Sequence, residues 1–236
     1  MNLIQKIKDK FLDNFNLVSG SLRSIRGDPE AWEASIRRFE GHERRQSPAD
    51  PVVFTGSSSI TFWSSLARDM APVPVLNRGF GGAKIADVVH YAARIVLPCR
   101  PCAVVLFAGT NDIAEPRPAT AQQVFEGYLA FVRIIQAALP AVPIYYVSIT
   151  PTPLRWKFWP VVQEANRLIQ AHTETDPRLR FLDITGAFLG PDGLPDRRLF
   201  RPDRLHPNAN GYEKWTTIIK PVLLADLFPN SDSEVL

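Results

Sequence analysis

The chain has 236 residues, 45% of them hydrophobic and 22% charged, which is the composition of a globular protein with one core and excludes a disordered chain. Its 27 lysines and arginines barely exceed its 24 aspartates and glutamates, and this small, dispersed excess argues against nucleic acid as a partner. Its apolar runs are far shorter than the roughly 20 residues of a membrane-spanning helix. Charges interrupt the first segment where a secretory signal would be apolar, so we expect a cytoplasmic protein.

Residues 1–26 predict an amphipathic helical extension. One helix face carries apolar side chains at Ile4, Ile7, Phe11, Phe15, Val18 and Leu22. Such a helix can pack on the domain, pack on a second subunit of a homo-oligomer, or lie on a membrane surface. Because Asp9 and Asp13 interrupt its basic polar face, packing is favoured over peripheral membrane contact.

Residues 27–228 alternate short apolar strands with amphipathic helices, and residues 229–236 form a polar tail. The expected strands are 52–55, 74–77, 103–108, 143–149 and 179–184. The expected helices are a first one from residue 28 and others near 84–97, 121–139, 161–172 and 208–227. This alternation predicts a single α/β domain, a doubly wound three-layer α/β/α sandwich with a mostly parallel five-stranded sheet.

Polar clusters follow three of the predicted strands, where open α/β sheets bind their ligands. They are residues 56–59, 79–82 and 109–112, and a fourth cluster, 203–206, precedes the last helix. A serine hydroxyl becomes a good nucleophile when a histidine takes its proton and a carboxylate orients that histidine. Asp203 and His206 have the spacing for this pair, while Gly82 and Asn111 offer amides to an oxyanion.

In this order, the four segments resemble the signature blocks of the SGNH hydrolases, also called GDSL esterases and lipases. The matching segments are Gly56-Ser57-Ser58, Asn77 to Gly82, Gly109-Thr110-Asn111-Asp112 and Asp203-Arg204-Leu205-His206. The resemblance implies a flavodoxin-like fold with no metal or organic cofactor. It also implies Ser58 as nucleophile, His206 as base and Asp203 as its orienting partner. The implied oxyanion hole consists of the Ser58 and Gly82 backbone amides and the Asn111 side chain.

One departure lies beside the predicted nucleophile, because Ser57 stands where the family usually has aspartate. Ser57 and Ser59 therefore remain rival nucleophiles, although the family register favours Ser58. In the neighbouring block, Asn111 is expected to be functional and Asp112 structural.

The expected substrate is a small ester, and the favoured activity is that of a short-chain carboxylesterase. The alternatives are a carbohydrate acetylesterase, a lysophospholipase or thioesterase acting on lipid-like esters, and a catalytically silent binding protein. Trp156 and Trp159 follow the fourth predicted strand, where we favour core packing over pocket lining. Cys99 and Cys102 have the spacing of a redox motif, but they follow a helix and lack a second ligand pair, so neither a redox nor a metal role is expected.

Overall fold

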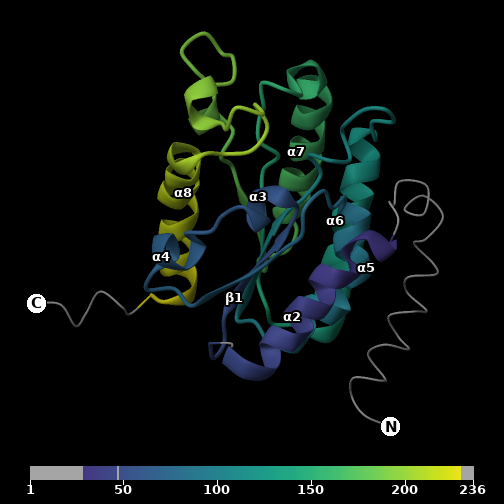
Figure 1. Cartoon of the computed structure of the whole chain (residues 1–236), viewed down its shortest axis with the longest axis vertical. Coiled ribbons are helices and arrows are strands. Elements are labelled where there is room, and N and C mark those ends of the chain that lie inside the picture. The colour runs from purple at the N-terminus through teal and green to yellow at the C-terminus, as the bar shows by residue number, and fades with distance from the viewer. Residues whose placement is uncertain (1–28, 47, 230–236) are drawn as a thin grey trace, which may run out of the picture.

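Five parallel strands form the central sheet of the computed structural model, which describes residues 29–46 and 48–229 (Figure 1). The strands are β1 (Val52–Gly56), β2 (Val75–Gly79), β3 (Ala103–Phe107), β4 (Ile144–Val147) and β5 (Leu179–Leu182). Their order across the sheet is β2-β1-β3-β4-β5, so the chain reverses its direction of winding between β1 and β3. The predicted doubly wound α/β fold is confirmed, and ligand sites in such sheets lie at this reversal, beyond the strands' carboxyl ends.

Helices cover both faces of the sheet. They are α2 (Glu33–Gln46), α3 (Ser58–Thr61), α4 (Leu66–Met70), α5 (Ile85–Ile95), α6 (Ala121–Ala138), α7 (Trp159–Thr173) and α8 (Ala209–Leu227). Figure 1 shows α4 and α8 on one side and α2, α5, α6 and α7 on the other. A 3-10 turn, Pro29–Trp32, leads into α2 where the first helix is expected. The expectations for residues 1–26 and for the tail from residue 230 lie outside the described residues.

The apolar runs form strands because both of their faces are buried. In β3, Val104 and Leu106 belong to the core under α5 and α6, whereas Val105 and Phe107 belong to the core under α8. Successive side chains of a strand point to opposite faces. A strand between two helical layers must therefore be apolar at every position, which is the pattern in the sequence.

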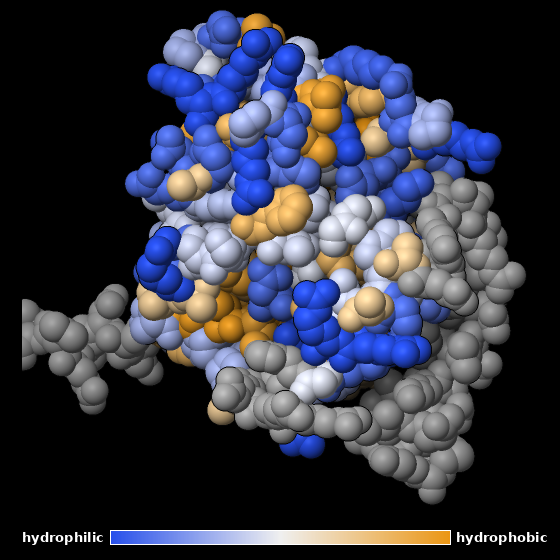
Figure 2. Space-filling view, in the orientation of Figure 1, coloured by the Kyte–Doolittle hydropathy of each residue, from blue (hydrophilic) through white to orange (hydrophobic). Residues whose placement is uncertain are grey.

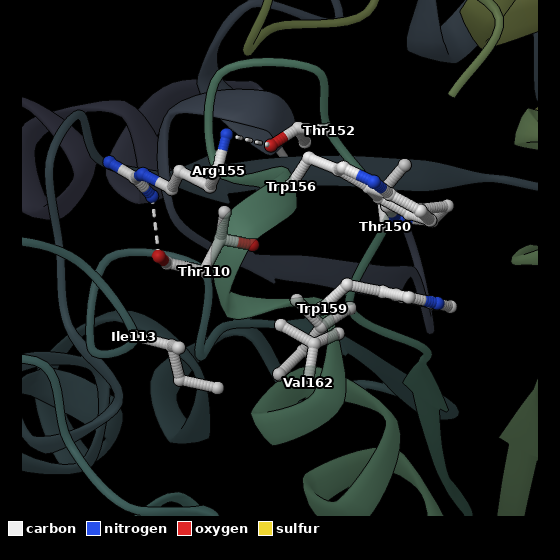
Figure 3. A pocket seen from close by; sticks show the side chains of 10 residues that line it. Thr110, Ile113, Thr150, Thr152, Arg155, Trp156, Trp159 and Val162 are labelled. Carbon is white, nitrogen blue, oxygen red and sulfur yellow. Dashed lines mark hydrogen bonds between the residues drawn. The ribbon is translucent and has the colours of Figure 1, made fainter. Parts of the chain in front are cut away.

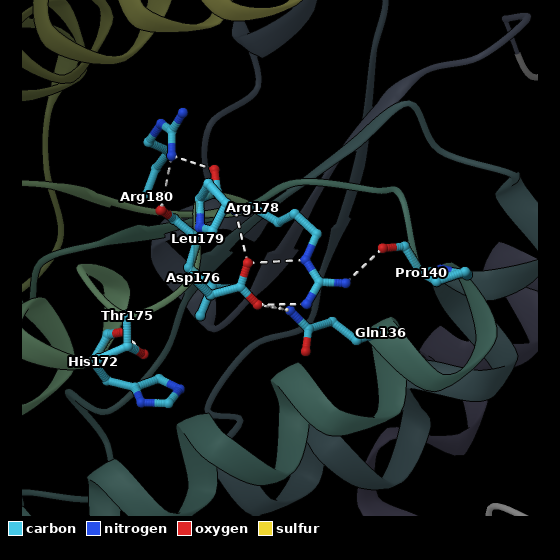
Figure 4. Close-up of polar contacts among 9 residues, drawn as sticks. Gln136, Pro140, His172, Thr175, Asp176, Arg178, Leu179 and Arg180 are labelled. Carbon is cyan, nitrogen blue, oxygen red and sulfur yellow. Dashed lines mark hydrogen bonds and ion pairs between the residues drawn. The ribbon is translucent and has the colours of Figure 1, made fainter.

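Polar contacts fix the turn that leads into β5 (Figure 4). The Asp176 carboxylate pairs with the Arg178 guanidinium at 2.6 Å and accepts a hydrogen bond from Gln136 of α6 at 2.9 Å. Arg178 also donates to the Pro140 carbonyl at 2.8 Å, and its hydrogen bonds to Asp176 hold the pKa of that carboxyl well below the ordinary value. These bonds tie the end of α6 to the start of β5, at the edge of the sheet opposite the strands' carboxyl ends.

The surface seen in Figure 2 is mainly hydrophilic and carries separate small apolar areas. One hollow opens between α4 and α2, where polar and apolar side chains of both helices and of β2 line a cavity. No helix in the described part of the chain is long and apolar enough to cross a membrane.

Candidate active site

Ser58 lies at the carboxyl end of β1, as the first residue of α3. The turn before it requires glycine, because Gly56 has φ +139° and a Cβ there would lie 1.9 Å from the Phe107 carbonyl oxygen. The Ser57 amide then bonds that carbonyl at 3.1 Å, which anchors the serine turn to β3. This close approach of β1 to β3 sets Ser58 at the reversal point of the sheet.

The Ser58 hydroxyl lies 2.7 Å from Nε2 of His206, although the two residues are 148 positions apart. On the other side of the ring, His206 Nδ1 lies 2.7 Å from Oδ2 of Asp203. Ser58, His206 and Asp203 thus form one continuous chain of hydrogen bonds. A nucleophile, a base and a residue that orients the base require this connectivity.

A tight turn holds Asp203 against His206. Its Oδ1 accepts hydrogen bonds from the backbone amides of Leu205 at 2.9 Å and His206 at 3.0 Å, and Arg204 takes the left-handed φ of +59°. Burial acts to raise the pKa of Asp203, but the hydrogen bonds from the His206 ring and from the two amides outweigh it and lower that pKa to about 2. The carboxylate therefore stays ionised beside the imidazole at neutral pH.

The three adjacent serines have different surroundings. It is the Ser58 hydroxyl that contacts the His206 ring. The Ser59 carbonyl accepts a hydrogen bond from the Tyr212 hydroxyl at 2.8 Å, while the Ser57 carbonyl accepts the Ile60 amide that closes the α3 turn. The geometry thus favours Ser58 over both rivals as the residue that the histidine can activate.

The residues expected to bind an oxyanion lie along the same edge of the sheet. Asn111 Nδ2 donates to the Ala83 carbonyl at 3.0 Å, which joins the block after β3 to the glycine block after β2. Gly82, beside Ala83, is exposed and has φ +76°. The Ser58 amide is in the first turn of α3, where an amide has no carbonyl within its own helix to bond to.

Asp112 is almost fully buried, at 1% exposure, and holds the start of α5. Both of its carboxylate oxygens accept from the Ile85 amide, at 3.1 and 3.2 Å. Burial raises the pKa of Asp112 to about 7, against the opposing effects of the Ile85 hydrogen bond and the Lys84 charge. These contacts agree with the structural role expected for Asp112.

A small pocket lies beyond the carboxyl ends of β3 and β4 (Figure 3). Trp156 and Trp159 stack with ring centroids 5.6 Å apart and form one wall, and Thr110 and Thr150 also line the pocket. The expectation of core packing was therefore wrong for Trp156, whereas Trp159 lines the pocket and also packs against the core under α5 and α6. Both are half-buried, because the 3-10 turn Trp156–Phe158 places the stacked pair at the start of α7.

Two further residues beside the predicted site lie outside the four signature blocks. Arg155 donates to the Asn111 side chain at 3.1 Å, and Phe62 packs edge-on against the His206 ring with centroids 4.9 Å apart. Sequence reasoning missed both. The one signal in the sequence is their position, since Phe62 follows the serine turn and Arg155 lies in the loop after β4.

The Cys99 thiol donates to the Ile95 carbonyl at 3.2 Å, and burial raises the pKa of Cys102, whereas a reactive thiol needs a lowered one. Within residues 29–46 and 48–229, no group of three or more His, Cys, Asp or Glu side chains is arranged to hold a metal ion.

Comparison with known proteins gives a consistent result. A family model of the GDSL-like lipase/acylhydrolase family matches residues 44–214. Among solved structures, a GDSL-like lipase from Bacteroides thetaiotaomicron is 21% identical with a TM-score of 0.68, over 82% of this chain and 99% of that chain. A carbohydrate esterase family 3 protein from Talaromyces cellulolyticus is 19% identical with a TM-score of 0.60, over 74% and 96% of the two chains.

A lipase/acylhydrolase from Enterococcus faecalis is also 19% identical, with a TM-score of 0.59 over 74% of this chain and 96% of that chain. At these identities the likeness to the solved structures shows a shared fold. No curated protein matches the sequence.

Proposed function

Because the chain belongs to the GDSL-like lipase/acylhydrolase family, we propose that it hydrolyses short-chain carboxylic esters through an acyl-enzyme on Ser58. The observation that carries this proposal is the chain of two 2.7 Å contacts from Ser58 through His206 to Asp203. Each group needed for acyl transfer is present: a nucleophile, a base, an orienting carboxylate and amide donors at the same edge of the sheet.

In the first step, Ser58 Oγ attacks the ester carbonyl carbon while His206 Nε2 takes the hydroxyl proton. The carbonyl oxygen becomes an oxyanion, which accepts hydrogen bonds from the Ser58 and Gly82 amides and from the Asn111 side chain. The carbon–oxygen bond to the alcohol then breaks, and His206 gives its proton to the leaving alkoxide. Ser58 is left acylated.

In the second step, a water molecule attacks the acyl carbon and gives a proton to His206. The bond from the acyl carbon to Ser58 Oγ breaks, His206 returns its proton to the serine, and the carboxylic acid leaves. Asp203 stays ionised throughout because its pKa is about 2, so it stabilises the imidazolium in both steps.

The small size of the pocket in Figure 3 favours substrates with a short acyl group. The pocket begins at Thr110, next to Asn111 in the chain, and is walled by Trp156 and Trp159. The space inside admits about one water-sized group, so the methyl of an acetyl group fits and a longer chain is blocked unless the tryptophans move. A carbohydrate acetylesterase is the second candidate, because the same pocket accepts acetyl and one similar structure is a carbohydrate esterase.

Hydrolysis of p-nitrophenyl esters from acetyl to palmitoyl, run beside Ser58→Ala, tests the proposal. We expect the highest kcat/KM with the shortest acyl groups and loss of turnover in Ser58→Ala. Trp156→Ala should move the optimum to longer chains, whereas Trp156→Phe, which keeps an aromatic wall, should not. A rate that rises toward palmitoyl would favour a lipid-directed enzyme.

Absence of turnover with every ester, together with no reaction with a serine-directed phosphonate, would favour a binding protein. Acetylated sugars compared with p-nitrophenyl acetate separate the two candidates. A much higher kcat/KM for the sugar esters would make the protein a carbohydrate acetylesterase.

A further inference from the structure

The loop between β4 and α7 brings a cation to the predicted oxyanion hole. Arg155 Nη1 donates to Oδ1 of Asn111 at 3.1 Å and also bonds the carbonyl of Thr110. Figure 3 shows the guanidinium on the Thr110 side of the pocket, pointing away from Trp156 and Trp159, with its bond to that carbonyl dashed. One side chain therefore holds both the backbone and the side chain of the block after β3.

The contact with Arg155 decides which way the Asn111 amide faces. A guanidinium has five N–H donors and no acceptor, so the asparagine must present its oxygen to Arg155. Its nitrogen then faces the glycine block, where it donates to the Ala83 carbonyl at 3.0 Å. An amide nitrogen has two hydrogens, so the second one is left for a ligand.

The charge on Arg155 acts in the same direction as its hydrogen bond. The guanidinium is half-buried, and among the described residues it has no carboxylate within ion-pair distance. Burial lowers the pKa of Arg155 and the nearby Asp112 charge raises it, but an arginine stays protonated at the pH of any assay. A cation on the oxygen side of an amide polarises it and strengthens its N–H as a donor.

The loop that carries Arg155 is itself fixed to the turn that carries His206. The Leu154 amide donates to the Arg204 carbonyl at 3.0 Å, and the Arg155 amide donates to Thr152 at 3.2 Å. The backbone of this loop is thereby bonded to the turn that carries Asp203 and His206, while its Arg155 side chain bonds Thr110 and Asn111.

We propose that Arg155 is the positioning residue of the oxyanion hole, which orients the Asn111 amide and strengthens it as a donor to the developing oxyanion. The inference rests on the proposed function of the site, since it assigns a positioning role toward Asn111, one of the proposed oxyanion donors. Preorganised donors contribute to catalysis when they meet the transition state without having to rotate into place.

A double-mutant cycle tests the proposal through Asn111. The variants are Arg155→Met, which keeps the apolar stem, Arg155→Lys, which keeps a charged donor, Asn111→Ala, and the double variant Arg155→Met with Asn111→Ala. Removal of one oxyanion donor costs about a hundredfold to a thousandfold in kcat, so loss of its positioning residue should cost about tenfold or more. We expect this loss in kcat with KM nearly unchanged, and a smaller loss in Arg155→Lys.

In the Asn111→Ala background, Arg155→Met should have almost no further effect on kcat, because the amide that it positions is gone. Thermal unfolding of every variant separates misfolding from lost positioning. Should Arg155→Met fail to fold, Arg155→Lys and its combination with Asn111→Ala complete the same cycle.

Unchanged kcat in a folded Arg155→Met variant would overturn the inference. So would an equal loss of kcat with and without Asn111, because the two residues would then act independently. If the wild-type protein hydrolyses esters and Ser58→Ala does not, either result contradicts the role of Arg155 and leaves the proposed function intact. An inactive wild-type protein contradicts the proposed function itself, and the inference with it.

Discussion

Replacement of Asp112 by asparagine measures the cost of a carboxyl group buried between two signature blocks. Asp112 is 1% exposed, and burial raises its pKa from 3.8 to about 7. Because this pKa is higher in the folded state than in the unfolded chain, the folded state binds the proton more tightly between these two values. The stability that protonated Asp112 contributes is complete below pH 3.8 and is lost as the pH rises toward 7.

The size of this loss follows from the same two pKa values. One pKa unit corresponds to about 1.4 kcal/mol, so a pKa raised by about 3 corresponds to roughly 4 kcal/mol of unfolding free energy; roughly 3 kcal/mol of it should be lost between about pH 4 and about pH 7, and the rest as the pH rises further. Asparagine keeps an oxygen for the Ile85 amide but binds no proton, so Asp112→Asn should lack this fall. Urea denaturation of both proteins across this pH range gives the difference in unfolding free energy at each pH.

Asp196→Asn is the matched control, because hydrogen bonds from Arg198 lower the pKa of Asp196, opposite to the shift at Asp112. The difference between wild type and this control should stay nearly constant over the same pH range. A difference between wild type and Asp112→Asn that is equally constant would refute the reasoning, since the buried carboxyl would then have an ordinary pKa.

Three other substitutions test separate parts of the account. Asn111→Ala should lower kcat by about a hundredfold to a thousandfold with little change in KM, and an unaltered kcat in an ester assay would remove Asn111 from the oxyanion hole. Asp203→Asn should lower kcat by up to about ten-thousandfold, because a neutral amide no longer orients and stabilises the imidazolium; an active variant would contradict the orienting role. Trp215→Ala, in the core under α8, should lower the unfolding free energy by about 3–5 kcal/mol in urea denaturation, and a loss under 1 kcal/mol would contradict tight packing there.

The strands could be predicted from the sequence because each is an apolar run between two helical layers, but their ends could not. The run 143–149 predicts a longer strand than β4, which stops at Val147. The Ile149 amide bonds the side-chain oxygen of Asn166 at 2.8 Å instead of a neighbouring strand. A side chain from α7 thus replaces the partner strand at Ile149. The local sequence pattern does not predict this contact, because Asn166 lies in another element. Helices α3 and α4 have four and five residues, too few for helical periodicity to register.

The candidate site also contains residues that could be predicted from the sequence and others that could not. Ser58, Asn111, Asp203 and His206 could be named because each lies in a short block of unusual residues at the end of a predicted element. Arg155 could not, because it is a single arginine whose contact with Asn111 spans 44 positions of the chain. Its role depends on how closely β3 and β4 approach at their carboxyl ends, which is a property of the folded sheet.

The central claim, that His206 activates Ser58 as the nucleophile, is tested most directly by covalent labelling. A fluorophosphonate reacts with an activated serine by forming an oxygen–phosphorus bond and releasing fluoride, and peptide mass spectrometry then identifies the labelled residue. Wild type, Ser58→Ala, His206→Ala and the matched control Ser59→Ala should be compared. We predict a label on Ser58 that is lost in Ser58→Ala and His206→Ala and retained in Ser59→Ala. A label on Ser57 or Ser59, or labelling that persists in Ser58→Ala, would contradict the account.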